Sequence, residues 1–401
     1  MTKSWKHYYT RCLERSDAPL HFAAHSHHPW PDVSFDAHMQ VWEDATTQLD
    51  HKWGRVFGEI KPALQQDIAA LLSLPDPSSI AFGPNTHDFV RRLISCLMTE
   101  PGHVPHILTT DSEFYSFARQ VDRMEEDGFI RVTRIPTEPF ADFEQRFCAA
   151  VAAGGHDMVF VSQVFFNSGL VVEGLDRIAA SLPDKETLLV FDGYHGFMAL
   201  PTDLSAVADR AFYMSGGYKY AQGGEGVCFM HCPDGYGTRP LDTGWMAAFG
   251  ALTGAQDGVP YAPDGDRFTG ATYDPSGLYR QAAVLELFRR QGPDVDLATR
   301  YCTGLQALFL NGLEALPASP LQGARLLIDP RISGPRCGRF LTFETPDAAQ
   351  ISDALAARGI ITDHRAGRIR FGFGIYQDDS DIAQLLTHLA EMADKSAVSA
   401  V

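Results

Sequence analysis

One lysine and one aspartate in this chain have the surroundings that covalent chemistry on a small aldehyde requires. Lys219 lies in a glycine-rich segment, residues 215–224, and Asp192 directly follows the apolar run Thr187–Phe191. Flanking glycines allow a flat ring to approach the backbone, and a lysine amine can form a Schiff base with an aldehyde. An aspartate that ends a buried strand can pair with a pyridinium nitrogen, so that the ring accepts electrons. Together the two residues predict a site for pyridoxal 5'-phosphate (PLP).

Each of these residues alone has a simpler interpretation. A lysine in a glycine-rich loop is commonly a solvated surface residue, and a strand-terminal aspartate commonly caps the next helix. The context favours the PLP interpretation, because Thr187–Phe191 is a continuous apolar run of the buried parallel-strand type. A second such run, Ala211–Met214, leads to Lys219.

Composition and charge exclude several classes of partner. The 401 residues are 45% hydrophobic, which is ordinary for a globular protein with room for two domains. Fifty acidic against 33 basic residues give a formal charge of −17, which opposes binding to nucleic acid or to an anionic membrane. The seven cysteines are scattered, which favours reduced thiols, and no apolar stretch approaches about 18 residues. We therefore expect a soluble cytoplasmic protein that acts on a small molecule.

Apolar runs alternate with helical patterns over most of the chain and predict a mainly parallel sheet. Helices are expected to begin near Asn85 and after Ser112. The expected strands are Ser79–Gly83, His106–Thr110, Met158–Ser162 and the two runs that lead to Asp192 and Lys219.

The pattern changes near residue 295 and predicts a second, smaller α+β domain. Strands are expected at 339–343 and 368–373, and helices at 347–358 and 378–395. The predicted organisation is an N-terminal segment that joins the small domain (1–50), a large PLP-binding domain (51–295) and a C-terminal small domain (296–401).

A PLP site also needs a place for the phosphate group. The segment Asn85, Thr86, His87 precedes a helical pattern, so free backbone N–H groups and the helix dipole could hold a dianion there. An ordinary Asn/Thr helix cap is the alternative interpretation. Phe114 follows a predicted strand end, where its ring could stack on the pyridine, although alone it would be read as a core residue.

Three arginines gather around the strand predicted at 368–373. A planar guanidinium can hold the α-carboxylate of an amino acid with two parallel hydrogen bonds. Arg370 lies between Ile369 and Phe371, so strand alternation places it on the opposite face from theirs. A solvated arginine stripe is the alternative.

In this order along the chain, the motifs resemble the class V aminotransferase family of fold-type I PLP enzymes, and within it the kynureninase-like branch. The motifs that carry the resemblance are residues 192–195 (Asp-Gly-Tyr-His), 218–220 (Tyr-Lys-Tyr) and 363–372. The resemblance covers most of the chain. It implies the α/β fold of the aspartate aminotransferase-like PLP-dependent transferases.

The resemblance also implies roles for residues around one cofactor. Lys219 would form the Schiff base, Asp192 would pair with the ring nitrogen, and His195 would lie near the ring oxygen. Tyr218 would contact the phosphate and assist proton transfer. The other expected cofactor contacts are Asn85, Thr86, His87, Phe114, Trp245 and Thr272. Trp245 and Thr272 would come from a second subunit, because such enzymes are homodimers with a shared active site.

On the substrate side the chain departs from the kynureninase pattern. Kynureninases carry Gly-Asn-Ser-Leu-Gly near the N-terminus and an Asn-Pro-Pro loop, where this chain has Ala23–Pro29 and Tyr273–Pro275. Arg370 is expected to bind the substrate carboxylate, and His25 is expected on a substrate-facing loop. His25, His27 and His28 could suggest a metal site, but no downstream Cys or His cluster completes one, so no metal is predicted.

The expected reaction is kynureninase-like hydrolysis of a Cβ–Cγ bond in an α-amino acid. The alternatives are a class V aminotransferase, a lyase or desulfurase-type elimination, and a non-catalytic PLP-fold binding protein. Sulfur transfer is disfavoured because Cys337 is expected at a strand start, where the resemblance predicts no mobile catalytic loop. The same core residues serve hydrolysis and transamination.

Overall fold

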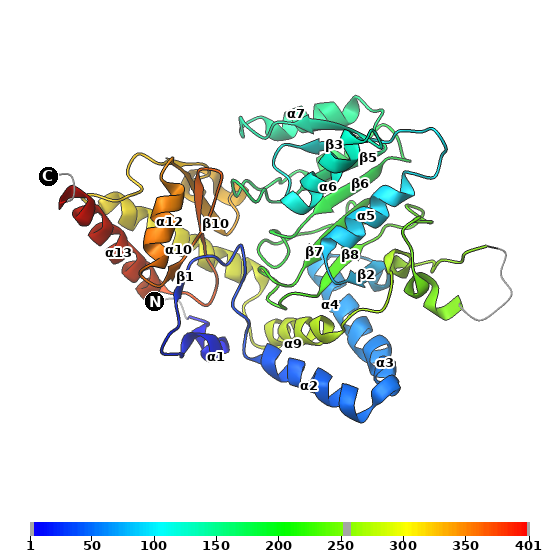
Figure 1. Ribbon diagram of the computed structural model, residues 1–401, viewed down its shortest axis with the longest axis horizontal. Coiled ribbons are helices and arrows are strands. Elements are labelled where there is room, and N and C mark those ends of the chain that lie inside the picture. The colour runs from blue at the N-terminus through cyan, green and yellow to red at the C-terminus, as the bar shows by residue number, and fades with distance from the viewer. Residues whose placement is uncertain (1–3, 252–257, 399–401) are drawn as a thin grey trace.

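The computed structural model describes residues 4–251 and 258–398, and it consists of a larger and a smaller part that lie side by side (Figure 1). A seven-stranded sheet forms the centre of the larger part and a four-stranded sheet the centre of the smaller part. This arrangement confirms the predicted fold class, α/β with a large mainly parallel sheet and a small C-terminal α+β domain.

The large sheet has the strand order β2-β8-β7-β6-β5-β3-β4. Every neighbouring pair is parallel except the two that involve β8, which runs against both β2 and β7. The strands are β2 (Ile80–Gly83), β3 (His106–Thr110), β4 (Arg131–Ile135), β5 (Met158–Ser162), β6 (Leu188–Asp192), β7 (Ala211–Gly216) and β8 (Cys228–His231).

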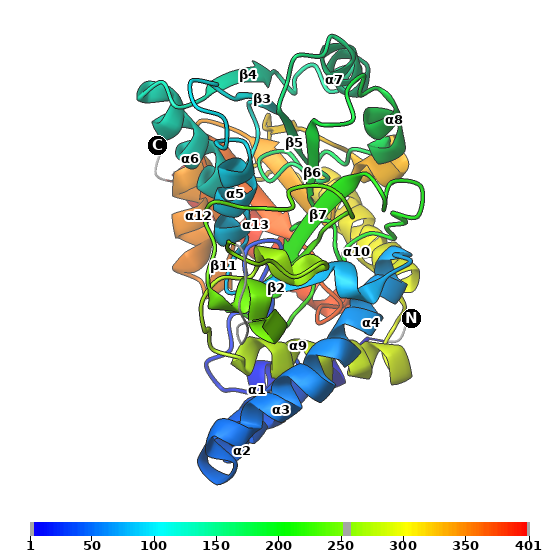
Figure 2. The same ribbon diagram turned by 90° about the vertical axis from the view of Figure 1, so that its right-hand side faces the viewer.

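Helices cover both faces of this sheet, which explains why its strands are continuous apolar runs. Met158 and Phe160 pack in one core with α5 (Thr86–Cys96) and α6 (Tyr115–Glu126). Val159 and Val161 point to the opposite face, where α4 (Lys61–Leu72), α7 (Phe143–Ala152) and α8 (Leu175–Ala180) pack (Figure 2).

The smaller sheet is antiparallel, in the order β12-β13-β10-β9. Its strands are β9 (Arg325–Leu326), β10 (Phe340–Glu344), β12 (Asp363–Arg365) and β13 (Arg368–Gly372). Its helices are α10 (Val295–Ala315), α11 (Pro330–Ser333), α12 (Ala348–Ala356) and α13 (Asp379–Val398).

The N-terminal segment lies against this smaller sheet. β1 (Leu20–His21) pairs in parallel with β11 (Ile360–Ile361), and Ala23 bridges to Gly372 at the end of β13. The chain then enters α2 (Val33–Thr47), which packs along α9 (Ser276–Arg290). The short helices α1 (Thr10–Leu13) and α3 (Lys52–Arg55) flank this region.

The observed elements follow the expected ones closely where the sequence is apolar. β3 and β5 have the predicted bounds, whereas β4 and β8 were not predicted. The domain boundaries stay a prediction, and residues 1–3 and 399–401 at their outer ends lie outside the described residues. Across 4–251 and 258–398, no helix is long and apolar enough to cross a membrane.

A cluster of buried aromatic rings forms part of the core of the small domain, and it generates a stability prediction. Phe309 of α10 is fully buried against the rings of Phe343, Phe371 and Phe373. Phe309→Ala leaves a cavity and should lower the free energy of unfolding by about 3–5 kcal/mol. Urea denaturation measures this change. Leu308→Ala, at an exposed neighbour on the same helix, is the control and should change stability little.

Candidate active site

Lys219 and Asp192 meet at one edge of the large sheet. Asp192 is the last residue of β6, β7 runs parallel beside it, and Lys219 follows the end of β7 by three residues. A cavity of about 750 Å³ opens at this edge. The predicted site residues that line it are Asn85, Thr86, His87, Phe114, Asp192, His195, Tyr218 and Lys219.

The Lys219 amine is buried and is held among aromatic rings. Its Nζ lies 4.5 Å from the ring centre of Tyr194 and 5.2 Å from that of Phe114. His195 Nδ1 lies 3.5 Å from the same nitrogen. Burial lowers the pKa of Lys219 to about 7, although the charge of Asp192 acts in the opposite direction. A substantial fraction of the amine is therefore unprotonated at neutral pH, as a nucleophile requires.

Asp192 has one occupied and one open carboxylate oxygen. Its Oδ1 accepts a hydrogen bond of 2.9 Å from the Tyr194 backbone N–H. Within the described residues no donor contacts the other oxygen. Burial raises the pKa of Asp192, whereas the Tyr194 hydrogen bond and the charge of Lys219 lower it. The open oxygen is suited to a cationic N–H donor.

His195 connects the cavity to the N-terminal segment. Its ring donates a hydrogen bond to the backbone carbonyl of His25 while Nδ1 faces Lys219. Burial and the nearby charges of Lys219 and Arg370 lower its pKa well below the usual value. The ring is therefore neutral, and its Nδ1 can accept a hydrogen bond from Lys219.

The phosphate end predicted from the sequence lies at the start of α5. The Asn85 side chain accepts a hydrogen bond of 2.8 Å from the Asp88 backbone N–H, so Asn85 acts as the N-cap of this helix. His87 Nδ1 is buried without a hydrogen-bond partner. Thr86 and His87 therefore keep polar groups available beside the cavity.

The remaining predicted residues do not line this cavity. Trp245 and Thr272 are exposed and do not line it. Arg370 is buried between the two parts of the molecule, where it donates to the Phe166 carbonyl and pairs with Asp363. His25 is fully buried next to Asp363.

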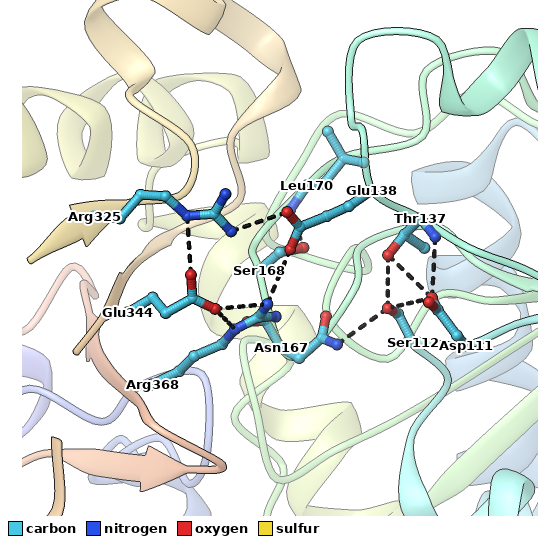
Figure 3. A network of polar contacts seen from close by, with 10 residues as sticks. All are labelled: Asp111, Ser112, Thr137, Glu138, Asn167, Ser168, Leu170, Arg325, Glu344 and Arg368. Carbon is cyan, nitrogen blue, oxygen red and sulfur yellow. Dashed lines mark hydrogen bonds and ion pairs between the residues drawn. The ribbon is translucent and has the colours of Figure 1, made fainter. Parts of the chain in front are cut away.

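A network of charged side chains fastens the two parts of the molecule together near Arg370. Arg325 and Arg368 from the small sheet each pair with Glu344 and with Glu138, which comes from the large part (Figure 3). Arg368 also donates to the backbone carbonyl of Asn167. Adjacent carbonyls of the large part therefore accept hydrogen bonds from Arg368 and Arg370, which point the same way from β13.

Several polar groups of the site were missed by sequence reasoning. Ser162 lines the cavity at the end of β5, beside Asp192 in register. Its hydroxyl donates to the buried carboxyl of Glu113, 2.5 Å away. Tyr194 lies inside the recognised Asp-Gly-Tyr-His motif, so that motif could have indicated it. No local signal identifies the role of Glu113, because Ser162, which brings it to the site, is distant in the sequence.

The three N-terminal histidines do not converge. His27 is exposed and stacks on Tyr218, and His28 is buried with its Nδ1 against the Pro29 carbonyl. Within the described part of the chain, no group of three His, Cys, Asp or Glu side chains could hold a metal ion.

The observed groups fit the chemistry of PLP at both of its ends. A buried amine with a lowered pKa lies at the same cavity as a carboxylate with an open oxygen, and an unpartnered His87 nitrogen lies at the start of α5. A side chain at Gly216 would collide with the Tyr194 hydroxyl and the Cys228 thiol, so glycine is needed where β7 meets the cavity.

Known proteins are similar in sequence to parts of this chain. Residues 304–389 match the family described as the kynureninase C-terminal domain. The kynureninases of Burkholderia mallei strain SAVP1 and Burkholderia pseudomallei strain 1106a are each 27% identical over 248 residues, which is 60% of this chain. The match spans 57% of the length of these curated relatives.

Solved structures share the fold at low sequence identity. The cystine C-S lyase C-DES, in complex with its reaction product cysteine persulfide, has a TM-score of 0.77 at 20% identity and covers 93% of this chain and 97% of its own. A C-DES mutant with glycine covalently linked to the PLP cofactor has a TM-score of 0.78 at 19% identity, over 97% and 99%. An apo cysteine desulfurase from Thermococcus onnurineus NA1 has a TM-score of 0.79 at 15% identity, over 98% and 99%.

The fold and the site define a PLP-dependent enzyme of fold type I, which confirms the predicted cofactor. Within this class the chain is similar to the kynureninase-like branch of the class V aminotransferase family, in agreement with the resemblance of its motifs.

The buried Glu113 carboxyl makes stability depend on pH. Burial raises its pKa to about 8, and the charge of Asp192 adds to this, although hydrogen bonds from Ser162 and Thr110 oppose it. The folded state therefore keeps a proton that the unfolded chain loses above about pH 4.3, so stability should fall between about pH 5 and 8. The expected slope is at most about 1.4 kcal/mol per pH unit.

Glu113→Gln should flatten this slope, because the amide does not titrate. Urea unfolding at several pH values measures it. Glu100→Gln, at an exposed position, should leave the wild-type slope unchanged. A variant Glu113→Gln with the wild-type slope would mean that Glu113 is ionised in the folded protein.

Proposed function

We propose that this enzyme hydrolyses the Cβ–Cγ bond of an α-amino acid that carries a γ-carbonyl group, as a kynureninase does. The observation that carries the proposal is the kynureninase-type C-terminal domain, which contributes Arg370 and Asp363 beside the cavity of Lys219. The 27% identity to kynureninases supports it.

The large part of the molecule would hold the cofactor. Bound PLP supplies an electron sink for a bond broken at the substrate Cα. Asp192 would direct its open oxygen at the ring nitrogen and keep it protonated. Phe114 would stack on the ring face, and Thr86, with His87, would bind the phosphate at the start of α5.

Lys219 would form the link to the cofactor and would then move protons. Its low pKa lets Nζ take a proton from the substrate Cα near neutral pH and then deliver it to another atom of the reacting substrate. His195 Nδ1, 3.5 Å away, would accept a hydrogen bond from Nζ and orient it. Tyr218 lines the same cavity, and burial raises its pKa to about 12, so its hydroxyl stays protonated and can donate to a substrate carbonyl.

The small part of the molecule would hold the substrate. Arg370 is buried and points at the large part, so it can fix the α-carboxylate and thereby the bond that stands perpendicular to the ring. His25 lies beside Arg370 on the N-terminal segment, and we propose that it also faces the substrate.

Elimination at a carbon–sulfur bond is the second candidate, because the cystine C-S lyase C-DES shares the fold over 97% of its length. A desulfurase that uses a protein thiol is not supported by the cysteines near the site. Cys337 is buried and burial raises its pKa to about 12, and the same holds for Cys228. Such thiols are poor nucleophiles at neutral pH. Transamination stays an alternative that uses the same residues.

Product analysis separates these reactions. We expect the PLP-loaded enzyme to convert kynurenine or 3-hydroxykynurenine to alanine and the corresponding aromatic acid without a keto acid, as measured by mass spectrometry. Sulfide or persulfide from cystine, with no such cleavage, would favour elimination. Turnover only with a keto-acid acceptor would favour transamination.

Lys219→Ala should abolish turnover and the visible absorbance band of the protein-linked cofactor, because the linking amine is gone. Lys185→Ala, at an exposed position, should retain both. An unchanged band in Lys219→Ala would contradict the assignment of the linking lysine.

We also propose a homodimer in which Trp245 and Thr272 complete the phosphate site of the partner subunit. Both are exposed and lie outside the cavity of their own subunit. Sedimentation should therefore give a mass of about two chains, and Trp245→Ala should lower PLP affinity severalfold. Trp42→Ala, at another exposed tryptophan, is the control. Equal PLP affinity in Trp245→Ala and wild type would count against a shared site.

A further inference from the structure

The buried guanidinium of Arg370 is only partly available in this structure. Its Nη1 donates to the Phe166 carbonyl, 2.5 Å away, and its Nη2 pairs with Asp363 Oδ2. Its Nε is buried without a partner. A carboxylate that docks with two parallel hydrogen bonds on the Nε and Nη2 edge therefore competes with Asp363 for Nη2.

His25 is a neighbour of Asp363 that could receive the carboxylate after its displacement. His25 Nε2 lies 3.7 Å from Asp363 Oδ2, too far for a hydrogen bond but within reach of a small rotation of the carboxylate. Both ring nitrogens of His25 are buried without a hydrogen-bond partner. The other oxygen of Asp363 faces Arg365 Nε at 3.7 Å.

The residues around His25 hold its ring in place. Its ring stacks on Phe340 with centres 4.7 Å apart, and a side chain at Gly372 would collide with His25 Nδ1. The bridge between Ala23 and Gly372 fixes the backbone next to it. Burying an imidazole that makes no hydrogen bond costs free energy of folding. Such a ring is explained if it gains a hydrogen-bond partner in another state of the protein.

We propose that His25 is a positioning residue that receives Asp363 when the substrate carboxylate takes Arg370, and that it binds one proton from solvent in that exchange. The inference rests on the proposed function, because it needs Arg370 to bind the substrate carboxylate. The exchange keeps the buried charges balanced: one carboxylate enters on Arg370, and one imidazolium forms against the carboxylate that leaves.

The charged groups around His25 give the direction of the proton movement. It faces Asp363 of β12, Arg370 of β13, His195 after β6, Lys219 after β7 and His21 of β1. Burial, and then the charge of Arg370, lower its pKa well below the usual value, so the free enzyme holds it neutral. A carboxylate on Arg370 removes that repulsion, and Asp363 then raises the pKa. Binding therefore takes up a proton and weakens as pH rises, at most about tenfold per pH unit.

The test compares L-alanine with L-alaninol, which has the same amine and no carboxylate. Each ligand is added to the PLP-loaded full-length enzyme in weak buffer near pH 7 with a pH-indicator dye, and binding is followed by cofactor absorbance. The enzyme should take up about one more proton per site when it binds L-alanine than when it binds L-alaninol. His25→Asn and Asp363→Asn should each lose this difference, whereas His27→Asn, on the same loop, should keep it.

Equal proton uptake by the wild-type enzyme on binding of the two ligands would overturn the inference. A wild-type difference retained in His25→Asn would overturn it equally. Absence of any change in cofactor absorbance with either ligand would instead refute the proposed function, and the inference with it. Asp363→Asn keeps the test decisive if His25→Asn does not fold, since both variants remove one partner of the exchange.

Discussion

The active site depends on the removal of one amine from water. Lys219 is surrounded by the rings of Phe114 and Tyr194 and has a carboxylate nearby that does not form an ion pair with it. Solvation would keep the amine protonated and unreactive, whereas a close ion pair would hold its charge permanently. The sheet edge avoids both, because parallel strands deliver Asp192 and Lys219 to the same side without bringing their charges into contact.

The two parts of the molecule divide the chemistry between them. Groups that would act on the cofactor come from the ends of β6 and β7 and the starts of α5 and α6, all in the large part. Groups that would act on the substrate carboxylate come from β12, β13 and the N-terminal segment. The charged network of Arg325, Arg368, Glu138 and Glu344 links the two parts of the molecule (Figure 3).

Local sequence predicted the elements that lie at the centre of the candidate site, but it did not predict several residues and one strand at its periphery. β3, β5 and the N-cap at Asn85 could be predicted because apolar runs and cap residues act over a few neighbours. β4 was missed because its exposed Arg131 and partly buried Thr133 and Arg134 break the apolar pattern of an edge strand. The roles of Glu113 and Asp363 depend on partners from other elements, which no local pattern encodes.

The single antiparallel strand β8 sets the dimensions of the site. It lies between β2 and β7, so β2 again runs in the direction of β7 and its end reaches the same edge. Strands lie about 4.8 Å apart, so the loop after β2 and the end of β6 are separated by three fixed steps, roughly 14 Å. The number of strands thus fixes the distance between the two ends of the candidate site. Insertions in the surface loops leave that distance unchanged. One added or lost strand between β2 and β6 would change it, so the two ends of the site would no longer fit the same molecule even if every functional residue were kept.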